Sequence, residues 1–398
     1  MKEFFIPSSK SISNRLLVIQ HLSQVKAKIN NLSLAQDTIL MKELLSQIEN
    51  SKNQTLYCHN AGTVLRFLLS LLAIKEGKWI IDGDERMKQR PIQPLIYALK
   101  ALGAQINYID VEYCLPLKIQ VKALKSNNPV KINSNLSSQF ASSLLLVSPY
   151  IEGGLELEIE NPVSLPYIQM TIALMREYGA KIEEKQNIIK VQQGKYTFKE
   201  TTVEGDWSSA CFAYEKICIY PGCKILIRNL NPHSLQADKT AIDYFSLLGV
   251  ESQFINNNLH LSYNPENISN QETLTFNIKH CPDMFPSLAL AGFISNKTII
   301  FEEIDTLKLK ESNRTEAVKE GLQKLGADAE IDRNNRFVIK ATNKSFENPK
   351  EKTIIKTFND HRISMAFGML QVKYDNIIVD DKECVNKSFP NFWQNVNP

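Results

Sequence analysis

The sequence predicts an α/β protein in which one structural unit recurs along the chain. Four apolar segments with helical spacing end at a glycine, and these glycines recur at intervals of 70 to 77 residues: Gly103, Gly179, Gly249 and Gly326. Glycine readily adopts the left-handed backbone conformation that closes a helix. One such ending is common in proteins, but four at near-equal spacing indicate a repeat. We therefore expect helices packed against sheets in more than one lobe.

A strand is expected after each of these glycines. The expected first strands are 105–110, 181–183, 251–255 and 328–331. Asparagine-rich turns or loops follow, and in three cases a clear second run comes next, at 188–191, 259–262 and 337–339. Two such runs around a polar turn are typical of a hairpin. The repeated unit is thus a helix, a glycine stop, and two strands joined by a turn.

Length and composition indicate a globular chain of several domains. The chain has 398 residues, of which 43% are hydrophobic and 22% charged. At about 100 to 200 residues per domain, this length predicts two or three domains. The longest apolar run, 67–74, is far shorter than the roughly 20 residues that span a bilayer. No signal-peptide core follows Met1, so we expect no membrane span and a cytoplasmic location.

The charge balance and the cysteines exclude other classes. The 46 basic and 43 acidic side chains leave a net charge of only +3. This excess of positive charge is too small to indicate a nucleic-acid surface. The seven cysteines contain no Cys-x-x-Cys pair, and the six histidines form no metal-ligand motif. We therefore expect reduced cysteines, no bound metal and no nucleic-acid partner.

Several expected helices begin with polar residues that carry a basic side chain or an amide beside them. These starts are residues 8–15, 60–66, 135–139 and 359–362. Free backbone N–H groups and the helix dipole make such a terminus favourable for an anion. Any one start is explained by an ordinary helix cap, but a cap needs no neighbouring cation. The cations at these starts are Lys10, Arg15, Arg66 and Arg362. With two further basic segments, 84–91 and 310–314, the pattern predicts a polyanionic substrate.

Other phosphate and hydrolase motifs are missing from the sequence. No Gly-x-Gly-x-x-Gly occurs, and the Gly321 to Gly326 spacing is followed by Ala327-Asp328 where a nucleotide loop requires Lys and Ser or Thr. No Gly-x-Ser-x-Gly turn occurs either. Nucleotide-loop and serine hydrolase chemistry are therefore not predicted.

Seven motifs, taken in order, resemble one family. They are Ser9-Lys10-Ser11-x-Ser13-Asn14-Arg15, Asn60-Ala61-Gly62-Thr63-x-x-Arg66, Arg86-Met87-Lys88-Gln89-Arg90-Pro91, Ser137-Ser138-Gln139, Glu204-Gly205-Asp206-x-Ser208-Ser209-Ala210, Lys310-Glu311-Ser312-x-Arg314 and Asn359-Asp360-His361-Arg362. This set resembles the 5-enolpyruvylshikimate-3-phosphate synthases (3-phosphoshikimate 1-carboxyvinyltransferases). The resemblance extends to Lys387-Ser388-Phe389-Pro390 and so covers nearly the whole chain.

The resemblance implies a two-lobed inside-out α/β barrel in which each lobe contains three repeated βαβαββ units. The chain would cross between the lobes near Lys10 and near Glu204-Gly205. Residues 1–9 and 205–398 would then form a discontinuous lobe with the base, the acid and part of the phosphoenolpyruvate site. Residues 10–204 would form a continuous lobe with shikimate 3-phosphate contacts and further phosphoenolpyruvate contacts. A monomer without a cofactor is expected.

The implied reaction transfers the enolpyruvyl group of phosphoenolpyruvate to the 5-hydroxyl of shikimate 3-phosphate by addition and elimination. Phosphate is released, and the step (EC 2.5.1.19) belongs to chorismate and aromatic amino-acid biosynthesis. Each substrate carries a phosphate and a carboxylate, which explains the basic helix starts. By resemblance, shikimate 3-phosphate is bound by Lys10, Ser11, Arg15, Ser137, Ser138, Gln139, Ser164, Tyr167, Asp283, Thr306 and Lys310. Phosphoenolpyruvate is bound by Lys10, Gly62, Arg90, Gln139, Arg314, Arg362 and Lys387.

Three residues match the family's catalytic groups. Asp283 matches the base for the 5-hydroxyl, and Glu311 matches the acid that protonates the vinyl methylene. Lys10 is expected to pair with substrate anions rather than to act as a nucleophile. An alternative for Asp283 is a cap of the apolar helix expected at 285–293, alone or in addition to catalysis.

The sequence departs from the family pattern at four positions. Ser8 replaces the usual Gly, Phe67 follows Arg66 where other members have Pro or another apolar residue, Asn313 replaces an Asp, and Thr306 stands where well-known members have an Asn. None of these changes removes a catalytic group. The resemblance also implies sensitivity to glyphosate, because Gly62 presents no side chain to that inhibitor.

Two alternatives to this function use the same scaffold. UDP-N-acetylglucosamine enolpyruvyl transferase carries a loop cysteine shortly before the equivalent of Arg90, where this chain has Glu85. A catalytically inactive, ligand-binding homologue would be expected to lose Lys10, Asp283, Glu311 or an arginine, and all of them are present.

Overall fold

The computed structural model describes residues 1–120, 123–126, 129–342 and 345–396, which form two compact units. One unit is Lys10–Val203, and the other combines Met1–Ser9 with Glu204–Pro398. Each unit has its own hydrophobic core. The backbone bridge between Ser8 and Gly205 joins the two segments of the discontinuous unit.

The Lys10–Val203 unit contains two four-stranded sheets of the same order, β3-β4-β6-β5 and β7-β8-β10-β9. Their strands are β3 (Asn53–Tyr57), β4 (Lys78–Asp82), β5 (Gln105–Tyr108), β6 (Leu117–Gln120), β7 (Val130–Asn133), β8 (Leu155–Glu160), β9 (Ile182–Lys185) and β10 (Ile188–Val191). In each sheet the first two strands pair in parallel and the last two form an antiparallel pair. A third sheet has two parallel strands, β2 (Ile29–Asn30) and β11 (Thr201–Thr202).

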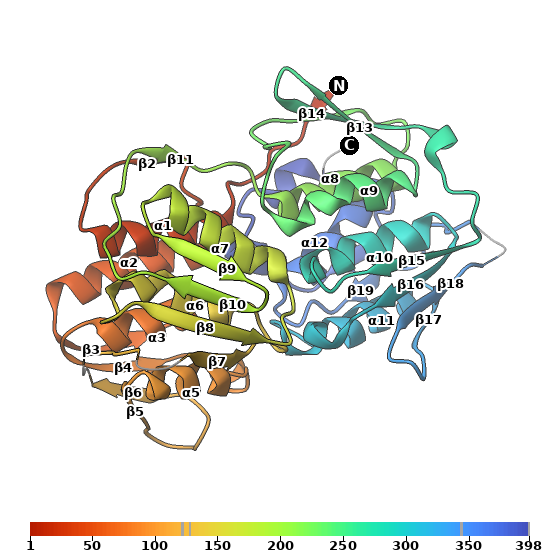
Figure 1. Cartoon of the computed structure of the whole chain (residues 1–398). Coiled ribbons are helices and arrows are strands. Elements are labelled where there is room, and N and C mark those ends of the chain that lie inside the picture. Colours follow the sequence, from red (N-terminus) through yellow and green to blue (C-terminus); the bar gives the residue numbers. More distant parts are fainter. Residues whose placement is uncertain (121–122, 127–128, 343–344, 397–398) are drawn as a thin grey trace. The chain divides into compact units, whose positions relative to one another are not determined.

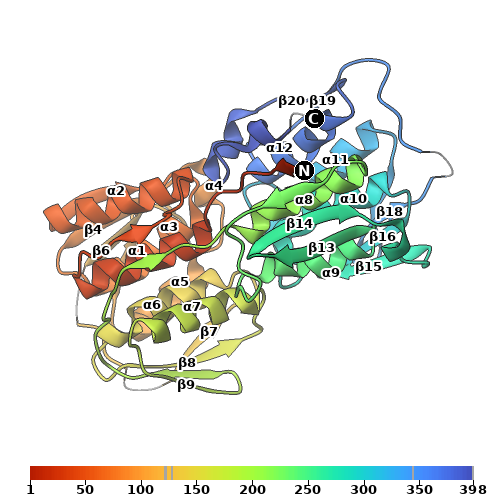
Figure 2. The same ribbon diagram turned by 90° about the horizontal axis from the view of Figure 1, so that it is seen from above.

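Three helices of this unit lie inside it, between outer helices and sheets (Figures 1 and 2). The inner helices α1 (Lys10–Ser23), α3 (Gly62–Ile74) and α6 (Gln139–Val147) contact one another. The other helices are α2 (Gln36–Asn50), α4 (Glu85–Lys88), α5 (Gln93–Ala101) and α7 (Leu165–Glu177). Nearly every residue of α3 and α6 is buried. An apolar helix without a polar face is expected at such a central position.

The discontinuous unit repeats this architecture. Its four-stranded sheets are β1-β12-β14-β13 and β15-β16-β18-β17, and β19 pairs with β20. The strands are β1 (Lys2–Glu3), β12 (Ile225–Ile227), β13 (Val250–Ile255), β14 (Asn258–Tyr263), β15 (Thr273–Asn277), β16 (Thr298–Glu302), β17 (Asp328–Ile331), β18 (Phe337–Lys340), β19 (Thr353–Ile355) and β20 (Ile377–Val379). The helices are α8 (Trp207–Ile219), α9 (Ala241–Ser246), α10 (Phe285–Ile294), α11 (Arg314–Lys324) and α12 (His361–Met369).

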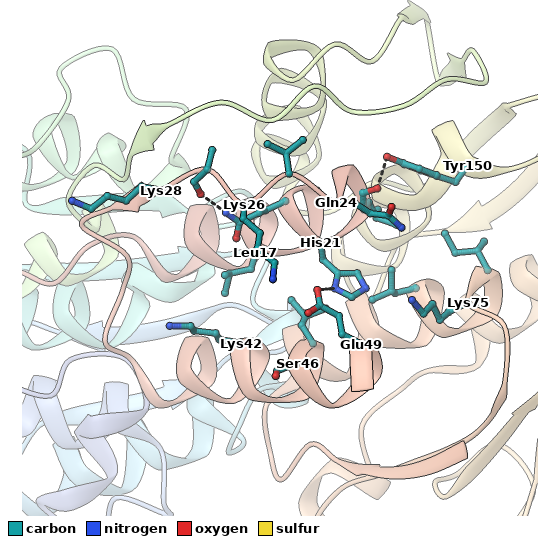
Figure 3. Close-up of a pocket in the computed structure, with 17 residues that line it drawn as sticks. Leu17, His21, Gln24, Lys26, Lys28, Lys42, Ser46, Glu49, Lys75 and Tyr150 are labelled. Atoms are coloured by element: carbon teal, nitrogen blue, oxygen red, sulfur yellow. Dashed lines mark hydrogen bonds and ion pairs between the residues drawn. The ribbon is translucent and has the colours of Figure 1, made fainter. Parts of the chain in front are cut away.

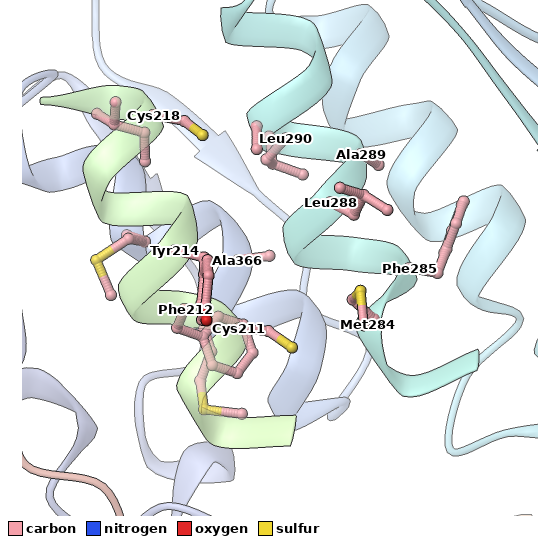
Figure 4. Close-up of a cluster of buried hydrophobic side chains, with 14 of the residues drawn as sticks. Cys211, Phe212, Tyr214, Cys218, Met284, Phe285, Leu288, Ala289, Leu290 and Ala366 are labelled. Atoms are coloured by element: carbon pink, nitrogen blue, oxygen red, sulfur yellow. The ribbon is translucent and has the colours of Figure 1, made fainter. Parts of the chain in front are cut away.

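Helices α8, α10 and α12 form the centre of this unit. They contact one another, and all residues of α8 and α12 are buried. Figure 4 shows part of the buried cluster to which all three helices contribute, including Phe212 and Tyr214 of α8, Leu288 of α10 and Ala366 of α12. This packing removes a large apolar area from water, which is the main favourable contribution to folding.

The predicted repeat is confirmed at its glycines. Gly103, Gly179, Gly249 and Gly326 have φ values of 100°, 94°, 91° and 84°, which only glycine adopts without strain. They follow α5, α7, α9 and α11, and a strand begins within three residues of each. The second strand missing from the sequence prediction is β6, which a loop of eight residues separates from β5. Each unit contains two complete βαβαββ copies and a third whose sheet has only two strands, so the third copy is abbreviated.

Within the described ranges, no helix has both the length and the hydrophobicity required to cross a membrane.

Candidate active site

Charged side chains of the discontinuous unit converge on Asp283, which lies in the 3₁₀ turn Pro282–Met284 before α10. Its Oδ1 accepts hydrogen bonds from Arg314 Nη1 at 2.7 Å and from Lys310 Nζ at 3.3 Å. Its Oδ2 accepts a hydrogen bond from Arg362 Nη2 at 3.0 Å. The two arginines come from the first turns of α11 and α12, and Lys310 lies just before α11, so two chain segments position this carboxylate.

These cations determine the ionisation of Asp283. Its partial burial opposes the charged form, but Arg362, Lys310 and Arg314 outweigh this effect and hold the pKa of Asp283 well below its usual value. Burial lowers the pKa of Lys310, although Asp283 partly offsets this effect. Asp283 is therefore an ionised carboxylate whose basicity depends on its cationic neighbours.

Arg314 connects three carboxylates. Its side chain is 1% exposed, and its guanidinium group donates to Asp283, to Glu311 Oε2 at 3.1 Å and to Asp360 Oδ2 at 2.9 Å. Lys387 Nζ lies 3.9 Å from the other oxygen of Glu311. Asp360 also caps α12, because it accepts a hydrogen bond from the Arg362 backbone N–H. One carboxylate therefore orients both the Arg314 side chain and helix α12. Such charge-assisted contacts have well-defined geometry.

The alternative helix-cap role of Asp283 is wrong. The residue at the N-cap position of α10 is Met284, and no side chain caps that helix. The oxygens of Asp283 are directed to three cations instead.

A second group of predicted residues meets at the starts of α3 and α6 in the Lys10–Val203 unit. Arg66 Nη1 donates to Gln139 Oε1 at 2.8 Å, and Gln139 Nε2 donates to Thr63 Oγ1 at 3.0 Å. Arg90 Nη1 donates to the Asn60 carbonyl at 3.3 Å. Two guanidinium groups and a primary amide thus lie beside two helix N-termini, which together favour an anion.

Gly62 is required for this arrangement. A Cβ atom on Gly62 would lie 2.6 Å from Arg66 Nη1 and 2.8 Å from Arg90 Nη1. Both distances are shorter than a nonbonded contact allows, so any side chain at this position would displace a guanidinium group.

Lys10 and Arg15, which are also predicted substrate contacts, lie on α1. Lys10 Nζ pairs with Asp37 at 2.9 Å. Arg15 is 2% exposed, and its Nε donates to Thr171 Oγ1 at 2.7 Å while Nη2 donates to the Tyr167 carbonyl at 3.1 Å. Burial lowers the pKa of Arg15 to about 10. Arg15 therefore links α1 to α7 through hydrogen bonds inside the protein.

The remaining predicted residues have differing surroundings. Ser137 Oγ accepts from the Gln139 backbone N–H at 3.2 Å. Ser138 is at the N-cap position of α6 but its hydroxyl makes no cap hydrogen bond. Ser164 precedes α7 in a left-handed conformation with φ 50°. Among the described residues, the buried Thr306 hydroxyl has no hydrogen-bond partner.

Four charged residues beside these groups were not assigned from the sequence to a particular substrate or to catalysis. They are Asp37, Arg66, Asp238 and Asp360. Arg66 and Asp360 belong to the motifs that match the family, so the motifs could have identified them as site residues. Asp37 and Asp238 belong to none of them. Burial, with the nearby Asp283 charge, raises the pKa of Asp238 to about 6. In the described part of the chain, no three His, Cys, Asp or Glu side chains are arranged to hold a metal ion.

Comparison with known proteins identifies a family. The family model for EPSP synthase (3-phosphoshikimate 1-carboxyvinyltransferase) matches residues 44–396. The 3-phosphoshikimate 1-carboxyvinyltransferase of Bacteroides fragilis is 34% identical over 98% of this chain and 93% of its own length. That of Colwellia psychrerythraea is 30% identical over 98% of this chain and 95% of its own length.

A solved structure agrees with these sequence matches. EPSP synthase from Acinetobacter baumannii superposes with a TM-score of 0.77 at 20% identity and covers 99% of this chain and 94% of its own. The similarity confirms the predicted two-lobed α/β fold. Since the family model and relatives above 30% identity each match most of the sequence, this chain belongs to the EPSP synthase family.

Proposed function

We propose that this chain is a 3-phosphoshikimate 1-carboxyvinyltransferase (EC 2.5.1.19) in which Asp283 and Glu311 move the protons. The enzyme transfers the enolpyruvyl group of phosphoenolpyruvate to the 5-hydroxyl of shikimate 3-phosphate in aromatic amino-acid biosynthesis. The assignment rests on the Asp283 carboxylate, which Lys310, Arg314 and Arg362 hold. Glu311 forms an ion pair with Arg314 as well. Family membership supports the reaction.

Each unit supplies part of the substrate contacts. In the discontinuous unit, Arg314, Arg362 and Lys387 bind the phosphate and carboxylate of phosphoenolpyruvate. In the other unit, its contacts are Lys10, Gly62, Arg90 and Gln139. Shikimate 3-phosphate is bound by Lys10, Ser11, Arg15, Ser137, Ser138, Gln139, Ser164, Tyr167, Asp283, Thr306 and Lys310. The burial and hydrogen bonding of these cations support the proposal, because fixed cations stabilise anions without reorganisation.

The reaction is an addition followed by an elimination, and each half needs two proton movements. In the addition, Asp283 takes the proton of the 5-hydroxyl group while the hydroxyl oxygen bonds to C2 of phosphoenolpyruvate. Glu311 delivers a proton to the methylene carbon. The resulting tetrahedral intermediate collapses with these movements reversed: Asp283 returns its proton to the leaving phosphate, Glu311 takes a proton from the new methyl group, and the vinyl ether is restored. Lys10 pairs with substrate anions in this scheme.

Substrate binding and base strength are coupled in this arrangement. Arg314 and Arg362 are the predicted phosphoenolpyruvate cations, and both are held by Asp283 in the structure. A substrate anion that attracts these guanidinium groups weakens their attraction to Asp283. The pKa of Asp283 then rises, so it becomes a stronger base when its co-substrate is bound.

The decisive assay measures phosphate released from phosphoenolpyruvate with either shikimate 3-phosphate or UDP-N-acetylglucosamine as acceptor. We expect phosphate release when shikimate 3-phosphate is the acceptor and none when UDP-N-acetylglucosamine is the acceptor. Release only with the UDP-sugar would favour the other transferase, and no release with either would favour an inactive homologue.

We propose that the protein is a monomer and that it is located in the cytoplasm. Light scattering after size exclusion tests the first, and fractionation of the producing cell tests the second. A stable dimer mass would contradict the proposed assembly.

A further inference from the structure

The Lys10–Val203 unit contains a cavity that the proposed reaction does not use. Its volume is about 790 Å³, and it is lined by residues of α1, the 24–28 loop, α2 and the end of α3, with Tyr150 beside them (Figure 3). Small-molecule sites commonly measure about 300 to 1,000 Å³, so the cavity is large enough for a ligand of one or two rings.

The cavity lies at the opposite ends of α1 and α3 from the predicted substrate contacts. Lys10 begins α1 and His21 lies near its end, which places them about 16 Å apart along the helix axis. Gly62 begins α3, whereas Ile74 ends it and lines the cavity. The cavity is thus separate from the residues assigned to the substrates.

The inner wall of the cavity is apolar. Leu17, Leu45 and Leu71 line it and are at most 6% exposed. Leu22 and Ile74 add further apolar surface. A ligand that fills this space must bring its own apolar body, because burial of apolar area provides the favourable free energy.

Four lysines line the cavity, Lys26, Lys28, Lys42 and Lys75; in Figure 3 the side chains of Lys28 and Lys42 extend to the left of His21, and Lys75 lies to its right. Within the described residues none of them forms an ion pair. The lining contains a single carboxylate, Glu49, whose Oε1 lies 3.2 Å from His21 Nδ1. The His21 side chain is only 8% exposed, and burial lowers the pKa of His21, so the imidazole adds a neutral polar group rather than a fifth charge.

Three carbonyl groups at the helix ends are satisfied by groups other than the lysines. The Leu22 carbonyl accepts from the Tyr150 hydroxyl at 2.8 Å, and the Gln20 carbonyl accepts from Ser23 Oγ at 2.7 Å. At the end of α3, the Lys75 carbonyl accepts from Trp79 Nε1 at 3.3 Å. The positive charge at this cavity is therefore available for an anion from solution.

We propose that this cavity binds a small amphipathic organic anion, with its apolar ring or rings against Leu17, Leu45 and Leu71 and its anionic group among the lysines. The inference is independent of the proposed function, since it shares no residue with the substrate assignment. The anionic group can be a carboxylate, sulfonate or phosphate, because each pairs with ammonium groups.

The test uses 8-anilinonaphthalene-1-sulfonate and its neutral analogue N-phenyl-1-naphthylamine, which differ only in the sulfonate. Fluorescence titration of the full chain is expected to show one saturable site that prefers the sulfonate. The double variant Lys42→Met with Lys75→Met should weaken sulfonate binding roughly five- to tenfold, the effect of losing two partly exposed ion pairs. The neutral analogue should be unaffected by the same variant.

Matched controls separate this site from non-specific binding. Lys118→Met with Lys185→Met removes the same charge from exposed positions on β6 and β9 and should leave binding unchanged. Ser46→Trp places a bulky side chain in the cavity and should reduce binding of both probes. Equal affinity for the two probes would overturn the proposal. Displacement of the sulfonate by phosphoenolpyruvate with shikimate 3-phosphate would also overturn it, by locating the probe at the substrate contacts.

Discussion

The Asp283 carboxylate and the Arg314 guanidinium form a 2.7 Å ion pair between Oδ1 and Nη1. The same arginine is buried and also holds Glu311 and Asp360. The proposed base and the proposed acid therefore share one cation, so a change at either carboxylate alters the field at the other. This relationship makes the proton-transfer groups sensitive to whatever binds Arg314.

Asp283→Asn keeps the shape of the side chain and removes its ability to accept a proton. We expect kcat to fall by about 10²- to 10⁴-fold, which is the usual contribution of a general base. The dissociation constant of shikimate 3-phosphate, measured by calorimetry, should change little. Arg15→Ala is the comparison: it should mainly weaken that binding. If both substitutions affected only binding, Asp283 would have no catalytic role.

Arg362→Gln removes one of three cations around Asp283 and leaves Lys310 and Arg314 in place. Loss of a nearby positive charge raises the pKa of a carboxyl group, so the pKa of Asp283 should increase. A protonated Asp283 cannot accept the 5-hydroxyl proton, and the acidic limb of the pH profile of kcat/KM should move to higher pH. Arg336→Gln is the control, because Arg336 pairs with Asp332 instead. An acidic limb that stays in place would contradict the proposed field effect.

Gly62→Ala introduces a methyl group 2.6 Å from Arg66 Nη1 and 2.8 Å from Arg90 Nη1. One guanidinium group must move, so we expect a higher KM for phosphoenolpyruvate as well as weaker inhibition by glyphosate. A loss of about 1.4 kcal/mol in inhibitor binding corresponds to a tenfold larger inhibition constant. Gly222→Ala is the control, because a Cβ there meets no atom within 4 Å. If the natural enzyme resists glyphosate and Gly62→Ala changes neither constant, Gly62 does not select between these ligands.

Glu215 predicts a pH-dependent stability. It lies in the middle of α8, is fully buried, and its two carboxylate oxygens have no hydrogen-bond partner among the described residues. Burial raises the pKa of Glu215 well above its usual value. The folded state therefore keeps a proton that the unfolded state releases, and the free energy of unfolding falls as pH rises above the usual glutamate pKa.

Glu215→Gln should remove this dependence and raise the free energy of unfolding at alkaline pH, by about 1–3 kcal/mol for a buried polar group relieved of its charge. Denaturant titrations at several pH values measure the effect. The exposed Glu272→Gln should leave the dependence intact. A natural protein whose stability does not fall from acidic to alkaline pH would show that Glu215 finds a partner on deprotonation.

Local backbone physics made the repeat readable from the sequence. Gly103 and Gly326 end helices because a positive φ strains every residue with a side chain, and that requirement is visible without knowing the fold. The helix that begins with Gly62 was predicted from a different signal, because polar and basic residues mark its start in the sequence. The motifs containing Lys310 and Arg362 likewise identified the family, since their order along the chain is a property of the sequence alone.

The pairings within the site were decided by tertiary structure. Nothing in the sequence links Lys10 to Asp37, or Asp283 to Arg362, because these residues are far apart along the chain and meet only when α1 packs on α2 and when α10 packs on α12. The alternative role of Asp283 as a helix cap was wrong for the same reason: cations from other segments, rather than the N-terminus of α10, hold its oxygens. The sequence by itself thus determined the repeated units, the family and the kinds of charged residue present. Which charges touch, and hence how strong a base Asp283 is, depended on side-chain packing between segments, because electrostatic energy is set by distance and burial rather than by sequence separation.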